Sequence, residues 1–217
     1  MFQAKIVQNS IKNMKGDKNY WEGIYESKNF EETSWYQSEP EFSLNIIESL
    51  GLSHEAAIID IGGGDSILAE ALLERDYENL SVLDIAANVI DRAKTRLGKN
   101  ASKIDWIVSD VTKFEASTKY DLWHDRVTFH FLTAEEAVQD YLDILQKAVK
   151  SGGYVFLATF SENGPEKCSG LPIQQYSSEE MTRLLAPHFE ALSVRNIDHV
   201  TPWGAKQNLT VGLFQKK

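Results

Sequence analysis

The sequence predicts an α/β fold with one mostly parallel sheet of seven strands, helices on both of its faces and an antiparallel hairpin at its carboxyl end. Two observations support this prediction. From residue 56 onward, short runs rich in β-branched and aromatic residues alternate with helical patterns, which is typical of a parallel sheet. The last two apolar runs, 189–200 and 208–217, are joined by a turn-rich segment without a helix, which predicts a hairpin.

Five earlier apolar runs are expected to form the parallel strands. They cover residues 56–62, 79–85, 104–110, 120–126 and 153–160. Helical patterns fill the intervals between them, at residues 66–75, 86–98 and 133–153. The polar stretch at 160–177 follows the fifth strand and is expected to be a long loop near the ligand-binding edge of the sheet.

Residue types near the ends of these patterns indicate where two of the helices begin or end. Gly98 closes the second pattern, because glycine readily adopts the positive φ found just after a helix. Thr133 opens the third pattern with Glu136 three residues later, which is the capping-box spacing. Gly152 and Gly153 are expected to end that third helix.

The composition indicates an ordinary globular protein and argues against several classes. Hydrophobic residues make up 42% of the 217 positions and charged residues 25%, which suits one domain with a sizeable core. The net charge of −10 counts against a nucleic-acid partner. The single cysteine, Cys168, excludes an internal disulfide and a CxxC metal site, so no metal is expected. No apolar run is long enough for a membrane span, and none resembles a secretory signal, so a cytoplasmic location is expected. The protein is expected to be a monomer or a homodimer.

The chain is expected to divide into an N-terminal arm with an aromatic lid (1–40) and a single domain (41–217). The first twenty residues hold four lysines and one aspartate and lack arginine, which favours a loosely docked arm over an organellar targeting segment. The stretch that follows is acidic and aromatic. Trp35 and Tyr36 are expected to form a lid there, since large rigid side chains exclude water from a bound ligand.

Four aspartates lie at the carboxyl ends of the predicted parallel strands. Asp60, Asp84, Asp110 and Asp125 end the first four strands in chain order. Ligands of such open sheets bind outside these strand ends. Any one of the acids is as easily explained as a helix N-cap, but four at one edge indicate a binding site.

Three consecutive glycines follow the first strand. Gly62 and Gly64 allow a ligand to lie against bare backbone, and the next helix presents unpaired N–H groups suited to an anionic group. Asp84 follows Gly62 by 84 − 62 = 22 residues, close to the roughly twenty expected for a carboxylate that binds ribose hydroxyls. The pattern therefore predicts an adenosine-containing ligand with an anionic attachment, and both dinucleotides and S-adenosylmethionine fit.

Three features favour S-adenosylmethionine over a dinucleotide. A dinucleotide loop needs glycine where this chain has Ile67, whose side chain would crowd a pyrophosphate. A dehydrogenase generally needs a substrate domain, for which 217 residues leave little room. The terminal hairpin is the third feature, because it reverses the last strand of the sheet in a way that is not typical of a dinucleotide domain.

In these motifs the chain resembles the class I S-adenosylmethionine-dependent methyltransferases, from about Tyr20 onward. "IIDIGGGDS" is similar to the first motif of that family, "VLDI" to its ribose-binding acid, "IVSDV" to its third motif and "YDLWHDRVTFHFL" to its fourth. The resemblance implies the Rossmann-like class I methyltransferase fold, S-adenosyl-L-methionine as cofactor and S-adenosyl-L-homocysteine as product. The chain departs from the family pattern at Ser66, where a third glycine is frequent.

The resemblance also implies which residues contact the cofactor. Asp60 would bind its ammonium group, Asp84 its ribose hydroxyls and Asp110 its adenine amino group. The other expected cofactor contacts are Gly62, Gly63, Gly64, Ile85, Val111 and Trp123, together with Tyr36 from the lid.

Catalysis of methyl transfer asks little of the protein, because orienting the acceptor for displacement at carbon supplies most of the rate. The candidate catalytic residues are His124, Asp125 and Arg126. A histidine such as His124 titrates near neutral pH and suits a general base, with a structural role as the alternative. Asp125 and Arg126 either pair with each other or meet the acceptor.

The expected acceptor is a small molecule, because "YWEGIYES" and "TSWYQ" resemble the opening of small-molecule thiol and thiopurine methyltransferases. The candidate acceptor contacts are Trp35, His130, Phe160, Cys168 and Trp203. His130 and Cys168 are as readily explained as core side chains. A protein methyltransferase acting on lysine is one alternative, since an acidic surface attracts a basic segment. A dinucleotide-dependent enzyme, or a cofactor-binding protein without catalysis, is another.

Overall fold

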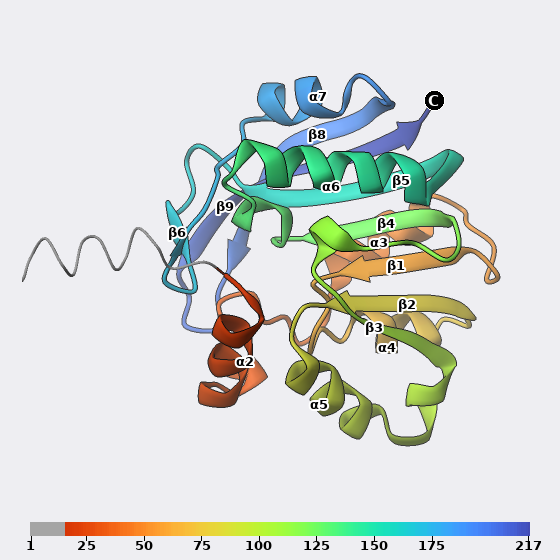
Figure 1. The fold of residues 1–217 in the computed structure, drawn as a ribbon, viewed down its shortest axis with the longest axis vertical. Helices are drawn as coiled ribbons and strands as arrows, with labels where there is room; N and C mark the ends of the chain where they lie inside the picture. The colour runs from red at the N-terminus through yellow and green to blue at the C-terminus, as the bar shows by residue number, and fades with distance from the viewer. Residues whose placement is uncertain (1–15) are drawn as a thin grey trace, which may run out of the picture.

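A seven-stranded sheet forms the centre of the computed structural model, which describes residues 16–217 (Figure 1). In their order across the sheet the strands are Ile104–Val108 (β3), Asn79–Asp84 (β2), Ala57–Ile61 (β1), Tyr120–Arg126 (β4), Val149–Phe160 (β5), Lys206–Lys216 (β9) and Phe189–Val200 (β8). Strands β1 to β5 run parallel, and β9 is antiparallel to both β5 and β8. The predicted α/β fold with its C-terminal hairpin is confirmed.

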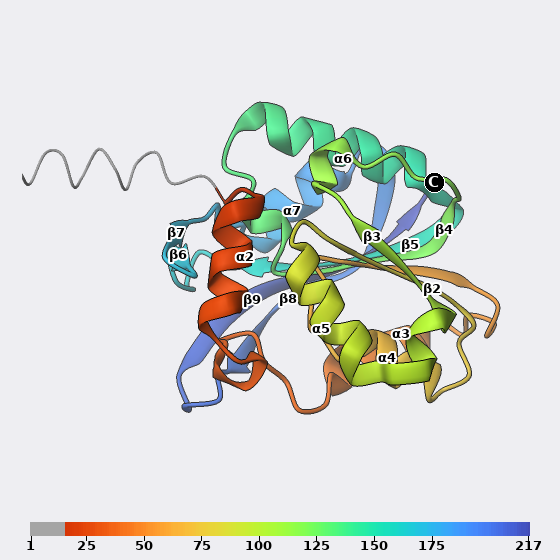
Figure 2. The same ribbon diagram turned by 60° about the horizontal axis from the view of Figure 1, so that its bottom comes forward.

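Helices cover both faces of this sheet (Figure 2). One face carries α3 (Glu41–Ser49), α4 (Leu68–Leu73) and α5 (Ala87–Leu97), and the other carries α6 (Glu135–Ala148) and α7 (Ser178–Leu185). The N-terminal helix α2 (Lys18–Ser27) lies beside α5 and a separate small hairpin made of β6 (Lys167–Cys168) and β7 (Leu171–Pro172). The 3₁₀ turns are Phe30–Glu32 (η1), Gly98–Lys103 (η2), Val111–Lys113 (η3) and Phe129–Phe131 (η4).

The sheet buries apolar side chains on both faces, which is why its central strands are nearly continuous apolar runs. On the side of α6 and α7, Trp123 and Tyr141 belong to one core cluster. On the side of α3 and α4, Ile47 and Phe156 belong to a second. Side chains alternate along a strand, so neighbouring residues of β4 point to opposite faces.

The third predicted helix is shorter than expected and the strand after it is longer. Helix α6 begins at Glu135 without a side-chain cap bond, so the capping box expected at Thr133 does not form. Strand β5 follows directly at Val149, and the glycines at 152–153, which were expected to end the helix, lie inside this strand. The pairing of β4 with β5 shifts register there, and Gly152 adopts a φ of +75°, which a side chain disfavours.

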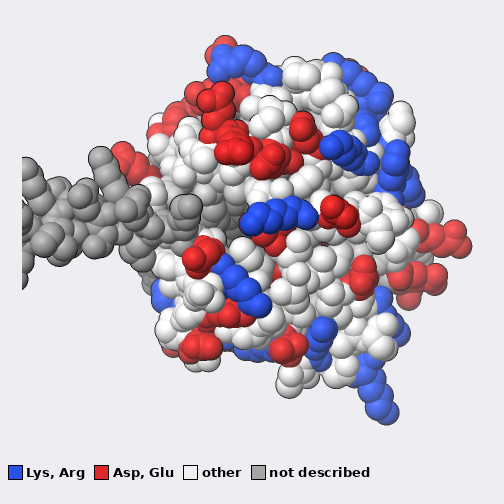
Figure 3. Space-filling view, in the orientation of Figure 1, with Lys and Arg blue, Asp and Glu red and all other residues white. Residues whose placement is uncertain are grey.

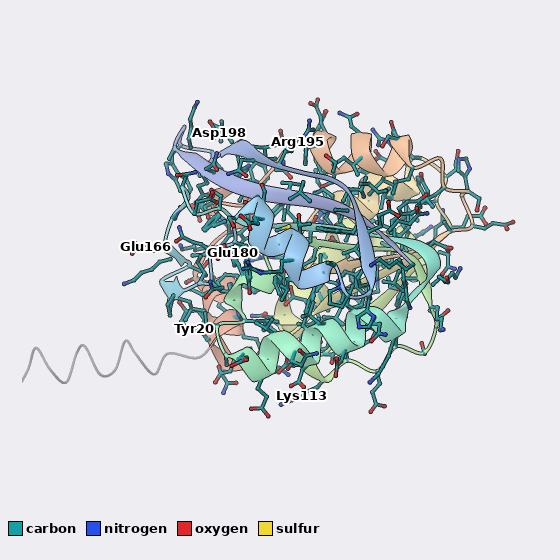
Figure 4. All side chains as sticks on the ribbon, turned by 90° about the horizontal axis from the view of Figure 1, so that it is seen from above. Tyr20, Lys113, Glu166, Glu180, Arg195 and Asp198 are labelled. Carbon is teal, nitrogen blue, oxygen red and sulfur yellow. The ribbon has the colours of Figure 1, made fainter. Side chains whose placement is uncertain are left out.

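Helix α3, helix α7 and the β6–β7 hairpin have no counterpart in the prediction from sequence. Helix α7 does have a sequence signal, since Ser177 and Glu180 show the capping-box spacing. The Glu180 N–H donates to the Ser177 hydroxyl at 3.2 Å, and the Ser177 N–H donates to the Glu180 carboxylate at 2.9 Å (Glu180 is labelled in Figure 4). The helix buries Met181 and Leu185.

The arm predicted for the first twenty residues falls mostly outside the described range, which begins at residue 16. Within 16–217, no helix combines the length and apolarity that crossing a membrane requires. The same range contains no group of three or more His, Cys, Asp or Glu side chains arranged to hold a metal ion.

A buried hydrogen-bond network joins α6 to the end of β4. The Trp123 indole donates to the Tyr141 hydroxyl at 2.8 Å, and that hydroxyl donates to Asp125 at 2.7 Å. Asp125 also accepts from the backbone N–H groups of Thr128 at 2.9 Å and Phe129 at 3.2 Å. Burial raises the pKa of Asp125 to about 7 despite these donors. The network therefore fixes the turn through which the chain leaves β4.

Replacing Tyr141 with phenylalanine should destabilise the protein. The substitution leaves the Trp123 indole without an acceptor and removes one donor from Asp125, each in a buried position. We expect Tyr141→Phe to lower the free energy of unfolding by about 1–3 kcal/mol, measured by urea denaturation. Tyr154→Phe is the control, because Tyr154 is a half-buried residue whose hydroxyl makes no hydrogen bond within residues 16–217. Equal effects of the two substitutions would contradict the importance of the network.

Candidate functional site

A hollow opens at the carboxyl ends of β1, β2 and β4, where the strand order reverses between β1 and β4. Open α/β sheets bind ligands at this position. Asp60, Asp84 and Asp110 line the hollow, and Asp65 of the glycine loop joins them. The sequence therefore brings a concentration of carboxylates to the edge at which a ligand is expected.

The glycine loop fits tightly against the protein itself. Gly62 has a φ of +64°, and a Cβ there would lie 1.9 Å from Thr128 Oγ1. A Cβ on Gly63 would lie 2.6 Å from Asp60 Oδ2. Gly62 and Gly63 line the hollow, whereas Gly64 does not. The packing of the chain therefore requires glycine at these positions. The sequence indicated only the other reason, which is the close approach of a ligand to bare backbone.

Asp84 is buried at the end of β2 in surroundings that disfavour a charged carboxylate. Burial raises the pKa of Asp84 to about 7, and the nearby charges of Asp60 and Asp65 add to the effect. One Asp84 oxygen accepts from the Ala86 N–H at 2.9 Å. A carboxylate in this state is stabilised by any further hydrogen-bond donor that a ligand brings.

The wall between the ends of β2 and β3 combines polar and apolar groups. Asp110 caps η3, where one of its oxygens accepts from the Thr112 N–H at 2.9 Å and from the Thr112 hydroxyl at 2.8 Å. Ile85 and Val111 line the hollow beside this carboxylate. An apolar slot with one acidic edge suits a flat heterocycle that carries an amino group.

Arg92 of α5 joins the glycine loop to the N-terminal helix. Its guanidinium pairs with Asp65, which Arg96 also approaches at 3.8 Å. Arg92 donates to the carbonyl groups of Tyr25 at 2.9 Å and Lys28 at 3.2 Å, at the carboxyl end of α2. Arg92 therefore holds both the glycine loop, through Asp65, and the carboxyl end of α2.

Aromatic rings from α2 and the segment after it cover the hollow. The ring of Trp21 packs edge-on against Phe131 at 4.8 Å and against Trp35 at 6.5 Å between centroids. All three rings line the hollow. Trp35 is among the residues expected there, but Trp21 is not. A helical signal exists for Trp21, since Tyr25 lies four residues later on the same helix face and also lines the hollow.

Two side chains of the sheet hold this cover by its backbone. The Arg126 guanidinium on β4 donates to the Trp35 carbonyl at 2.8 Å. On β8, His199 Nε2 lies 2.7 Å from the Ser34 carbonyl. Because both bonds use carbonyl groups, the Trp35 ring remains available for contact with a ligand.

His124 is engaged by the protein at both ring nitrogens. Its Nδ1 lies 2.7 Å from Asp60 Oδ1, and its Nε2 lies 3.0 Å from Ser43 Oγ. The ring stacks on Phe156 at 4.6 Å. As a general base His124 would have to turn one ring nitrogen toward the acceptor, whereas both nitrogens face protein side chains, so this geometry favours the structural role that the sequence also allows. Nothing in the sequence points to Ser43, which is 81 residues from its partner.

Two residues expected at the site face the opposite side of the sheet. Trp123 and Asp125 point from β4 toward α6, where both bond to Tyr141. The reason is the alternation of side chains along a strand, which sends His124 and Arg126 to the hollow. Asp125 and Arg126 consequently do not pair with each other.

The five expected acceptor contacts divide into three groups. Trp35 and Cys168 line the hollow. His130 and Phe160 are buried behind it, where the Phe160 N–H donates to His130 Nδ1 at 3.3 Å. Burial lowers the pKa of His130 to about 3, so its ring is neutral. Trp203 is 61% exposed in the turn of the C-terminal hairpin.

The environments of Cys168 and Tyr36 also bear on their expected roles. Burial raises the pKa of the Cys168 thiol to about 12, so the thiol stays protonated and serves as a small wall side chain. Tyr36 packs against Phe30 at 4.9 Å between ring centroids and lines a neighbouring hollow rather than this one.

Known proteins resemble the part of the chain that carries the site. A family model described as a methyltransferase domain matches residues 58–153. Malonyl-[acyl-carrier protein] O-methyltransferase 2 of Ilyobacter polytropus is 30% identical over 107 residues, which are 49% of this chain and 40% of that protein. EEF1A lysine methyltransferase 2 of Danio rerio is 23% identical over 190 residues, or 81% of this chain and 76% of that protein. The chain spans about half the length of the first curated relatives it matches.

A solved structure shares the fold over the whole chain. It is the 1,6-didemethyltoxoflavin-N1-methyltransferase of Burkholderia thailandensis, with bound 1,6-didemethyltoxoflavin and S-adenosylhomocysteine. The two chains superpose with a TM-score of 0.66 at 15% identity, covering 100% of this chain and 89% of the other.

Alanine at Gly62 should be more damaging than alanine at another glycine with a similar positive φ. Gly51 has a φ of +61° and open space around its Cβ position, so Gly51→Ala should cost only the positive φ, about 1–2 kcal/mol. Gly62→Ala must also displace Thr128, which adds about 1–3 kcal/mol of overpacking. Thermal unfolding of both variants tests this difference, and similar melting temperatures would contradict the tight packing of the loop.

Proposed function

The chain carries a class I S-adenosylmethionine-dependent methyltransferase domain, and on this premise we propose that it methylates a small-molecule acceptor bound beneath the aromatic cover. One observation carries the proposal. A single hollow combines strand-end aspartates suited to an adenosine with tryptophan rings from the N-terminal segment. The methyl donor is S-adenosyl-L-methionine, and S-adenosyl-L-homocysteine is the product left after transfer.

The residues of the hollow fit this cofactor. Asp84 would hold the ribose hydroxyls, because its buried carboxylate is stabilised by added donors. Ile85 and Val111 would pack against the adenine, with Asp110 at its amino edge, and Asp60 would meet the ammonium group. When bound, the cofactor supplies a methyl group on a sulfonium sulfur, which is a good leaving group.

The contribution of the chain itself is to orient the acceptor and to exclude water. Trp21, Trp35 and Phe131 form an apolar enclosure over the hollow, and correct orientation supplies most of the rate of a displacement. His124 has both nitrogens engaged, so its part is to hold Asp60 in position.

A protein methyltransferase acting on lysine is the second candidate, favoured by the likeness to EEF1A lysine methyltransferase 2. A net charge of −10 would attract a basic segment. On the face seen in Figure 3, however, Lys and Arg side chains lie among Asp and Glu rather than leaving a continuous acidic surface. That distribution and the aromatic rings that line the hollow both favour a small acceptor.

Asp84→Asn should weaken the binding of S-adenosylhomocysteine in a pH-dependent way. The Asp84 pKa of about 7 means that the wild-type carboxylate ionises as the pH rises through neutrality, and the ionised form accepts ribose hydroxyls more strongly. We expect a loss of about tenfold or more near pH 8.5 and a much smaller loss near pH 5.5, measured by calorimetry. Asp91→Asn, exposed on α5, is the control. An equal loss at both pH values would contradict the ribose role.

Partition of a labelled methyl group tests the nature of the acceptor. The protein is incubated with methyl-labelled S-adenosylmethionine and a cell extract, and the products are separated by size. Label in the small-molecule fraction supports the proposed function, and mass spectrometry of that fraction identifies the product. Label in the protein fraction would replace the small acceptor with the lysine alternative. A reaction with Asp84→Asn serves as the control for transfer that depends on the hollow.

A further inference from the structure

A second hollow lies beside the first, between residues 36–43 and the strands β5, β8 and β9. No part of the proposed function uses it. Phe42, Phe156 and Val211 form the apolar part of its wall. Residues 37–39 form a polar part. Arg126 lines both hollows, so this side chain marks the place where they meet.

Most of the hydrogen-bonding capacity of Arg126 is unused by the protein. Its guanidinium has five N–H donors, and within residues 16–217 it makes one hydrogen bond, to the Trp35 carbonyl at 2.8 Å. No carboxylate of the described chain lies within 4.0 Å of it. Asp60 contributes a favourable charge, but it is held by His124. A half-buried cation without an ion-pair partner is costly and is stabilised by an anion that a ligand brings.

Two further observations concern residues that share a hollow with Arg126. Gln37 lines the second hollow, and its amide oxygen is buried without a hydrogen-bond partner in the described chain. Val127, the next residue along, has a φ of +65°, which is rare for a β-branched side chain. Its N–H is fixed by the Ala158 carbonyl at 2.8 Å. Backbone strain of this kind clusters at ligand-binding sites, and Val127 lines the first hollow directly after Arg126.

We propose that Arg126 forms an anion subsite at the second hollow, which holds a carboxylate of the methyl acceptor while its reactive atom reaches the first hollow, with Gln37 accepting from a donor of the same ligand. The inference rests on the proposed function and names its substrate class. A planar guanidinium matches a carboxylate through two parallel hydrogen bonds. Gln37 Oε1 is an acceptor, so it would take a hydrogen bond from a donor group of the ligand beside that carboxylate.

The two acids that line the second hollow do not oppose such a ligand strongly. Asp198 lies toward the end of the β8–β9 hairpin, where it pairs with Lys206 at 3.1 Å and accepts from Asn208 at 2.8 Å (Figure 4). Glu39 is exposed to solvent, where water and salt screen its charge. Neither acid forms an ion pair with Arg126.

Binding of small carboxylates to the protein saturated with S-adenosylhomocysteine tests the subsite. The probes are acetate and benzoate, with the uncharged acetamide and benzamide as matched controls, followed by ligand-observed NMR. We expect at least one carboxylate to bind about tenfold or more tightly than its amide, and Arg126→Gln to abolish this difference. Arg126→Lys should retain part of it, since the charge remains and the paired geometry is lost. Arg183→Gln, on the exposed surface of α7, should change nothing.

Cofactor binding provides the second readout. The affinities of S-adenosylhomocysteine and of 5′-methylthioadenosine, which lacks the amino-acid part, are measured for the wild type and for Arg126→Gln. Unchanged affinities support an acceptor subsite, whereas a loss for S-adenosylhomocysteine alone would assign Arg126 to the cofactor carboxylate and overturn the proposal. Equal binding of carboxylates and amides to the wild type would overturn it too. Failure of the wild type to bind S-adenosylhomocysteine would instead refute the proposed function.

Discussion

The bond between the buried side chains of Asp60 and His124 is the contact on which the site depends. It joins β1 to β4 at 2.7 Å where the strand order reverses, and Ser43 extends it to α3 at 3.0 Å. Asp60 also occupies the space that a side chain on Gly63 would need, so the path of the glycine loop follows from it. A buried carboxylate without such a partner carries an uncompensated charge. Three distant segments therefore meet at the His124 ring.

The side chains on one face of strand β4 stabilise the fold, and those on the other face line the hollow. On one face Trp123 and Asp125 enter the network with Tyr141 that anchors α6. On the other face His124 and Arg126 reach the hollow. The same short strand thus holds the sheet to its helix layer and presents the polar groups of the site. Movement of α6 would shift the ligand-facing side chains, because both sets share one backbone.

The aromatic cover is attached to the rest of the site through backbone carbonyl groups. Arg92 holds the end of α2, Arg126 holds the Trp35 carbonyl and His199 lies against the Ser34 carbonyl. This arrangement leaves the rings of the cover free to contact a ligand. Arg92 also pairs with Asp65 of the glycine loop. The position of the cover and the conformation of the loop are consequently linked through a single guanidinium.

The sequence by itself determined the alternation of strands and helices along the chain, the glycine loop and the acids Asp60, Asp84 and Asp110 at the strand ends. These features follow from local patterns of apolar and turn residues, which act within a few positions of the chain. Only the tertiary structure decided that His124 is held by Ser43, that Trp21 lines the hollow and that β5 begins directly after α6. Each of these depends on strand register or on contact between segments far apart in the chain, and a local pattern carries no information about either.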